Sequence, residues 1–203
     1  MGYQSAIAPA QAEIVIKKSR FIALAQPIQS RAEGMNWLQQ VQQQYPDARH
    51  HCWAYLLGNP HCASSAGMGD DGEPSGTAGK PILNVLQHKS VGDVMIIVVR
   101  YFGGIKLGAG GLTRAYSQAA QAVMEVLPIA ENVPMVALKI HCGFSQEQQI
   151  RHLLAQYDGQ LQQVDYQQQV QLSVVLPKAC ESLFCEQLQP MQCGVKQQSE
   201  LAD

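Results

Sequence analysis

The sequence predicts an α+β protein of two domains. Short segments with the two-residue period of a strand alternate with longer segments that have the period of a helix. Residues 127–134 place two prolines around a polar dipeptide just after a long helical pattern, which predicts a helix end and a linker. Beyond this linker the order is βαββαβ, the ferredoxin-like pattern. We expect one domain over residues 1–130 and a ferredoxin-like domain over residues 131–203.

The N-terminal domain is predicted to order its elements as ββαβ and then αβα. These elements are strands 13–16 and 20–25, a helix 30–45, a strand 49–57, a loop 58–81, a helix 82–87, a strand 94–99 and a helix 110–127. Ser30 and Glu33 have the spacing of a capping box, which starts the first helix. The continuous apolar run at 94–99 indicates a strand that is buried on both faces.

The second domain follows from the same two periodicities. Its expected elements are a strand 136–142, a helix from Ser145 to Gly159, strands 161–167 and 170–176, a helix 178–188 and a weak last strand 193–201. Val136, Leu138 and Ile140 alternate with less apolar residues, as in a half-buried strand. Ser145 is expected to cap the first helix and Gly159 to end it.

Composition predicts a cytoplasmic protein without a membrane partner. With 203 residues, 46% of them apolar, the chain is long enough for two small cores. Its longest wholly apolar run is far below the roughly 18 residues that span a bilayer, and its start lacks the pattern of an export signal. The six cysteines have no compact disulfide spacing, so they are expected to stay reduced.

Charge is spread unevenly over the two predicted domains. The formal net charge of −2 excludes a globally basic nucleic-acid binder. Residues 1–128 carry ten Lys/Arg and eight Asp/Glu, whereas residues 129–203 carry four and eight. A polyanion is therefore expected to meet the N-terminal part of the chain.

The first glycine-rich segment, residues 70–81, has the sequence DDGEPSGTAGKP. Glycine permits close backbone approach, and the N-terminus of the helix that follows would offer unpaired N–H groups to an anion. The segment is not a Walker A loop, because Pro74 stands at the first glycine position and Pro81 follows Lys80. A structural turn before a capped helix is the alternative.

The second glycine-rich segment, residues 100–114, has the sequence RYFGGIKLGAGGLTR and joins the buried strand to a long helix. Backbone amides at such a junction often face a ligand. A dinucleotide fingerprint fails here, because Thr113 stands at the third glycine position. Arg100, Lys106 and Arg114 flank the glycines, as an anion-binding surface requires. A tight turn with ordinary surface cations is the alternative.

The sequence predicts neither a metal site nor a cofactor. Histidines and cysteines at positions 50–52 and 61–62 match no common zinc spacing. A nucleophile with a partnered base is not identifiable either, because the serine and threonine of the first glycine-rich segment form no recognised nucleophile elbow. Its clustered carboxylates are more typical of turn and cap residues than of an acid/base pair.

Three motifs taken together resemble the bacterial branch of the IMPACT family. They are RHHCWAY at 49–55, DDGEPSGTAGKPIL at 70–83 and VVRYFGGIKLGAGGLTRAY at 98–116. The resemblance implies an N-terminal domain with the fold of the second domain of a small-subunit ribosomal protein, which is also domain four of elongation factor G. A ferredoxin-like domain follows there too, and eukaryotic members of the family regulate translation.

The resemblance and the charge pattern together favour a non-catalytic binding protein of translation, with RNA, the ribosome or a translation factor as partner. An enzyme that acts on a phosphorylated small molecule, through His51, Asp71, Glu73 and the loop Gly103–Gly111, is the alternative. A third hypothesis is a protein-interaction module that uses the acidic second domain. The ligand-binding residues that we predict are Arg49, His51, Asp70, Asp71, Glu73, Lys80, Arg100, Gly103, Gly104, Lys106, Gly108, Gly110, Gly111 and Arg114.

Overall fold

A computed structural model describes residues 2–191 and 193–197 and has the predicted α+β class. The chain forms two compact units, one over Gly2–Asn132 and one from Val133 onward. Each unit has a hydrophobic core of its own. No helix among the described residues is long and apolar enough to cross a membrane.

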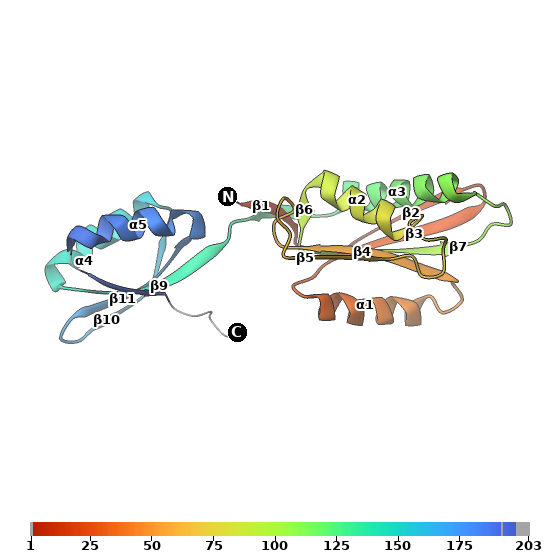
Figure 1. Ribbon diagram of the computed structural model, residues 1–203. Coiled ribbons are helices and arrows are strands. Elements are labelled where there is room, and N and C mark those ends of the chain that lie inside the picture. Colours follow the sequence, from red (N-terminus) through yellow and green to blue (C-terminus); the bar gives the residue numbers. More distant parts are fainter. Residues whose placement is uncertain (1, 192, 198–203) are drawn as a thin grey trace. The chain divides into compact units, whose positions relative to one another are not determined.

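The first unit is built on a five-stranded antiparallel sheet with helices on both faces (Figure 1). The strands, in spatial order, are β2 (Ala10–Ile16), β3 (Ser19–Pro27), β7 (Val94–Tyr101), β4 (His50–Leu57) and β5 (Ser65–Gly69). Helix α1 (Arg31–Gln44) covers one face, and helices α2 (Gly79–Lys89) and α3 (Ala109–Val126) cover the other. Because both faces are covered, β7 is almost wholly buried, which confirms the expectation for its apolar run.

Strand β5 lies in the segment that was expected to be a loop. It pairs antiparallel with β4, and its Gly67 and Gly69 stand opposite Tyr55 and Trp53. A Cβ atom at Gly69 would lie 2.5 Å from the indole of Trp53, and one at Gly67 would lie 2.6 Å from the ring of Tyr55. The two rings therefore lie over the glycines, and the strand lacks the apolar alternation that would have identified it.

The expected linker contains a strand. Strand β8 (Ile129–Asn132) pairs antiparallel with β1 (Tyr3–Ala6), which also pairs with the short β6 (Val91–Gly92). Asp93 is buried, and its carboxylate accepts hydrogen bonds from the Tyr3 hydroxyl (2.5 Å) and from the Gly58 N–H (2.8 Å). The segment expected to be a linker therefore contains a strand that is paired within the first unit, a feature that we did not predict.

The second unit has the predicted order βαββαβ. Its elements are β9 (Met135–Cys142), α4 (Glu147–Gln156), β10 (Gln160–Tyr166), β11 (Val170–Pro177), α5 (Glu181–Leu188) and β12 (Gly194–Gln197). The sheet order is β10-β11-β9-β12, all antiparallel. Ser145 does not cap α4 as expected, because a 3₁₀ turn over Phe144–Gln146 precedes that helix. The end of the predicted last strand, 198–201, lies outside the described residues.

Candidate functional site

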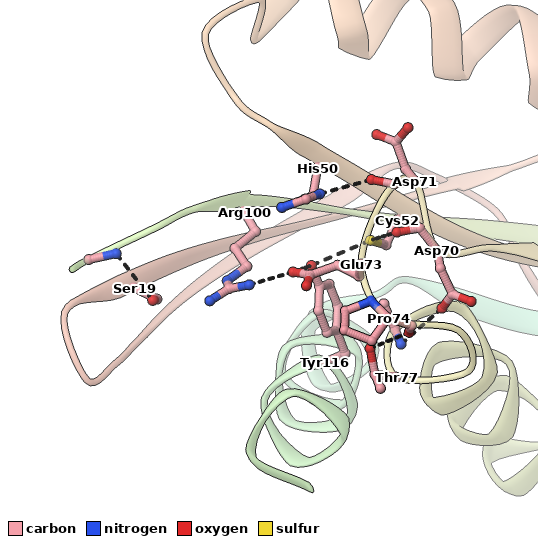
Figure 2. Close-up of polar contacts among 12 residues, drawn as sticks. Ser19, His50, Cys52, Asp70, Asp71, Glu73, Pro74, Thr77, Arg100 and Tyr116 are labelled. Atoms are coloured by element: carbon pink, nitrogen blue, oxygen red, sulfur yellow. Dashed lines mark hydrogen bonds and ion pairs between the residues drawn. The ribbon is translucent and has the colours of Figure 1, made fainter. Parts of the chain in front are cut away.

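The two glycine-rich segments converge at one end of the main sheet, where Glu73 and Arg100 form an ion pair (Figure 2). Glu73 Oε1 lies 2.5 Å from Arg100 Nη1 and accepts a second hydrogen bond, of 2.8 Å, from the Tyr116 hydroxyl. Both charged side chains are less than a tenth exposed. Glu73 therefore joins its loop to β7 and to α3 through its Oε1.

Cys52 extends this buried network. Its thiol lies 3.4 Å from the Tyr116 hydroxyl and 2.9 Å from the Asp70 carbonyl oxygen. Burial raises the pKa of the Cys52 thiol to about 12, with a further contribution from the nearby carboxylates, and burial likewise raises the pKa of Tyr116. Cys52 therefore stays a thiol at neutral pH and is a poor nucleophile.

Asp70 organises the first glycine-rich segment from within. Its Oδ1 accepts from the N–H groups of Ala78 (3.0 Å) and Gly79 (2.8 Å), and its Oδ2 accepts from Gly76 (2.8 Å). Desolvation alone would raise the pKa of Asp70, but these three donors outweigh it and lower that pKa. The carboxylate thus occupies the N-terminus of α2, where the sequence suggested that an external anion would bind.

Asp71 and His51 lie beside each other at the start of β4. Asp71 Oδ2 accepts from the His51 N–H (2.7 Å) and lies 3.6 Å from His51 Nδ1. His51 Nε2 is 3.2 Å from the Tyr45 carbonyl oxygen, so this nitrogen donates there. Asp71 is the more exposed of the two, with 39% of its side chain open to solvent against 7% for His51. These contacts fix the position of His51, and its side chain is buried.

Arg100 differs from the surface cation that the sequence suggested. Its guanidinium carbon lies 5.5 Å from the Phe21 ring centre and 5.8 Å from that of Phe102. Its Nε is buried and has no hydrogen-bond partner among the residues that the structure describes. Arg100 is therefore a buried, paired cation with one unsatisfied donor, while the Phe102 ring beside it is 56% exposed.

The second glycine-rich segment packs against the hairpin between β2 and β3. A Cβ atom at Gly103 would overlap the carbonyl group of Lys18, and the Gly103 N–H donates to Ser19 Oγ (3.2 Å). The backbones can approach this closely only because residue 103 has no side chain. The contact brings Lys17 and Lys18 next to the loop that carries Lys106.

Several glycines of the two segments face open space. No atom lies within 4 Å of the position that a Cβ would take at Gly76, Gly104, Gly108 or Gly110. Positive φ angles require glycine at the first three of these positions. Gly110 is helical and unobstructed, so nothing in the described fold requires its glycine. Gly111, by contrast, packs on Leu107.

The remaining predicted cations stand exposed around this end of the sheet. Lys106 lies in the second segment, Arg114 and Lys80 lie near the starts of α3 and α2, and Arg49 directly precedes β4. None of these four, nor Lys17 or Lys18, forms an ion pair with a described residue. The hairpin lysines were missing from our predicted site, because only the packing of Gly103 on Lys18 reveals that the hairpin joins it.

The described part of the chain contains no group of three His, Cys, Asp or Glu side chains that could hold a metal ion. Cys62 and His61 are exposed in the turn after β4. All six cysteines are free.

Comparison with known proteins assigns the chain to a family. A model described as the Impact N-terminal domain matches residues 17–124, and one described as a domain of unknown function (DUF1949) matches residues 140–191. The chain therefore belongs to the IMPACT family, as its three motifs suggested. It is 40% identical over 173 residues to the IMPACT family member YigZ of Escherichia coli, and the match covers 85% of each protein.

Two solved structures extend the comparison. One, titled as the crystal structure of a hypothetical protein, is 34% identical and has a TM-score of 0.68, with 100% of this chain and 98% of that chain covered. The other, the two-domain translational regulator Yih1, is 22% identical and has a TM-score of 0.36, with 61% and 47% covered.

Proposed function

We propose that this chain is a non-catalytic binding protein of translation, which contacts RNA through the basic end of its first unit. The observation that carries the proposal is the division of charge at this end. Asp70 and Glu73 are satisfied by backbone N–H groups and by Arg100, whereas six exposed cations around them lack an ionic partner among the described residues. Such a surface attracts phosphate.

The glycines support the same proposal. Open space surrounds Gly104, Gly108 and Gly110 near the start of α3, and the unpaired N–H groups at a helix N-terminus favour a phosphate oxygen. The exposed Phe102 beside Arg100 offers a ring on which an unpaired base can stack. Family membership adds the link to translation, since eukaryotic members of the same family regulate it.

The test is a salt titration of the binding of purified bacterial ribosomes and of a synthetic RNA hairpin to the full chain. In Lys18→Gln/Lys106→Gln, affinity should fall, and the slope of log K against log salt should flatten by roughly 0.7–0.9 for each phosphate that the variant no longer neutralises. The matched control is Arg31→Gln/Lys89→Gln. It removes the same charge from the same unit, at the start of α1 and the end of α2. If both variants weakened binding equally, the proposal that RNA binds at the basic end of the first unit would be rejected.

The enzyme hypothesis makes a different prediction for the same surface. Glu73→Gln should abolish turnover of phosphorylated metabolites if Glu73 is catalytic, with substrate binding retained. Under the binding proposal Glu73 only positions Arg100 and its loop, so Glu73→Gln weakens RNA binding and a metabolite screen of the wild type gives no turnover. Reproducible turnover that is abolished in Glu73→Gln would replace the proposal with the enzyme.

A further inference from the structure

The second unit carries two lysines side by side on the face of its sheet away from the helices. In β9, Leu138 and Ile140 pack against α4 and α5, so Lys139 projects from the opposite face. Lys196 of β12 stands directly opposite Lys139 in the antiparallel register. Ser173 of β11 pairs with Lys139 on its other side. The row across the open face therefore runs Ser173, Lys139, Lys196.

This pairing is unfavourable for the fold. Like charges directly opposite each other on antiparallel strands repel and destabilise the sheet. Neither lysine forms an ion pair with a described residue. The carboxylate on this face, Asp165, belongs to the outer strand β10 and accepts a hydrogen bond from Gln163 (3.0 Å). The two lysines therefore concentrate positive charge in the second unit, although residues 129–203 carry a net negative charge.

A polar hollow adjoins the lysines on the same face. His141 lies two residues beyond Lys139 on β9 and pairs with Gln171. These two residues, together with the glutamines of the β10–β11 turn, line a hollow of about 390 Å³. Ammonium, imidazole, amide and hydroxyl groups thus follow one another over the face, and each of them can donate a hydrogen bond to oxygen.

We infer that this face is a second RNA-contacting surface, which binds the sugar–phosphate backbone. Adjacent strands lie roughly 5 Å apart, so the row from Ser173 to Lys196 spans roughly 10 Å, longer than one phosphate group. Neither of the two rows contains a Phe, Tyr or Trp ring on which a base could stack, so backbone contact is favoured over base recognition.

An acidic peptide fits this face less well. Extended peptides add to the free edge of a sheet through main-chain hydrogen bonds. Lys139 stands on β9, both of whose edges are already paired, with β11 and β12, so only Lys196, on the outer strand β12, lies beside a free edge. The inference goes beyond the proposed function, because it concerns the other unit and depends on different residues.

The test uses the full chain with Lys139→Gln/Lys196→Gln, and Lys178→Gln as the control. Lys178 belongs to the same unit but lies in the short turn before α5. The probes are a synthetic RNA hairpin and polyglutamate. We expect weaker hairpin binding, with a salt slope flatter by roughly 0.7–0.9 for each lysine that contacts a phosphate. Lys178→Gln should bind as the wild type does. The thermal midpoint of the double variant should be equal or higher, because the repulsion is relieved.

The test of this face can fail independently of the test of the basic end of the first unit. The Lys18→Gln/Lys106→Gln variant is titrated in parallel, so either surface can fail while the other holds. Hairpin binding by Lys139→Gln/Lys196→Gln with wild-type affinity and salt slope would overturn the inference. It would equally be overturned if the double variant were impaired in polyglutamate binding alone, which would assign the face to an acidic protein.

Discussion

At the scale of single residues, the candidate site depends on which charges already have partners. A buried ion pair adds little net stability, but removal of one partner leaves the other charge buried and unpaired, which is strongly destabilising. Removal of the Glu73 carboxylate would leave the guanidinium of Arg100 as such a charge, since its Nε is already buried without a partner among the described residues. Glu73 therefore has a structural role that its loop sequence does not disclose.

Glu73→Gln should destabilise the first unit by about 1–3 kcal/mol, because the amide is a weaker partner for the buried guanidinium of Arg100. The measurement is urea denaturation at neutral pH. The control is Glu13→Gln, which removes the carboxylate of an exposed pair with Arg20 and should cost much less. Equal losses of stability in the two variants would show that the buried Glu73–Arg100 pair contributes no more to stability than the exposed Glu13–Arg20 pair.

Asp70 should make the stability of the first unit dependent on acid pH. Its pKa is lowered in the folded state, so its contribution is present above the ordinary carboxyl pKa of 3.8 and is lost as pH falls through the folded value. Urea midpoints of the wild type and Asp70→Asn should therefore differ most near neutrality and converge as pH falls further below 3.8. A constant difference across this range would contradict this account.

At the scale of elements, the predictable part of the fold is the part with side-chain periodicity. The Ser30 N-cap of α1 and the apolar run of β7 confirm the sequence prediction, although Glu33 accepts from the Gln29 N–H and so does not complete the capping box. Strand β5 was missed because its glycines accommodate the rings of Tyr55 and Trp53. The candidate site, like the fold, could be predicted only in part. Two charged loops could be named from the sequence, but the pairing of Arg100 with Glu73 follows only from how the strands align.

Glycine substitutions should separate the structural from the ligand-facing positions. Gly110→Ala should stabilise the first unit by about 0.4–1 kcal/mol, because its surroundings are open and its backbone is helical. RNA binding should nevertheless weaken if a phosphate approaches this backbone. Gly103→Ala should instead destabilise by about 1–3 kcal/mol, because its Cβ collides with Lys18. Denaturation midpoints and hairpin binding measure both effects, and stronger binding by Gly110→Ala would contradict the proposal.

At the scale of the whole molecule, the boundary between the units is set by hydrogen bonding. The expected linker looked irregular because its proline-bounded residues have no apolar periodicity, yet β8 is paired along its length with the N-terminal strand β1. Pairing between segments more than a hundred residues apart leaves no local signal in either of them.

Limited proteolysis should therefore first cut between β8 and β9, at residues 133–134, and give two stable fragments. Residues 129–132 are protected by their pairing with β1, so cleavage there should be slow. Mass spectrometry of early fragments identifies the site. Tyr3→Phe, which removes the hydrogen bond to Asp93, should speed cleavage within β8. First cuts within 129–132 in the wild type would show that the strand is not formed in solution.

The pairing of β1 with β8 also determines how a mechanical load would pass through the chain. Any pull on the second unit reaches the first unit at Asn132, whose amide hydrogen-bonds the carboxylate of Asp93. The four residue pairs between β1 and β8 then bear the tension before the five-stranded sheet does. The small sheet would therefore separate first, while the two glycine-rich segments keep their shape.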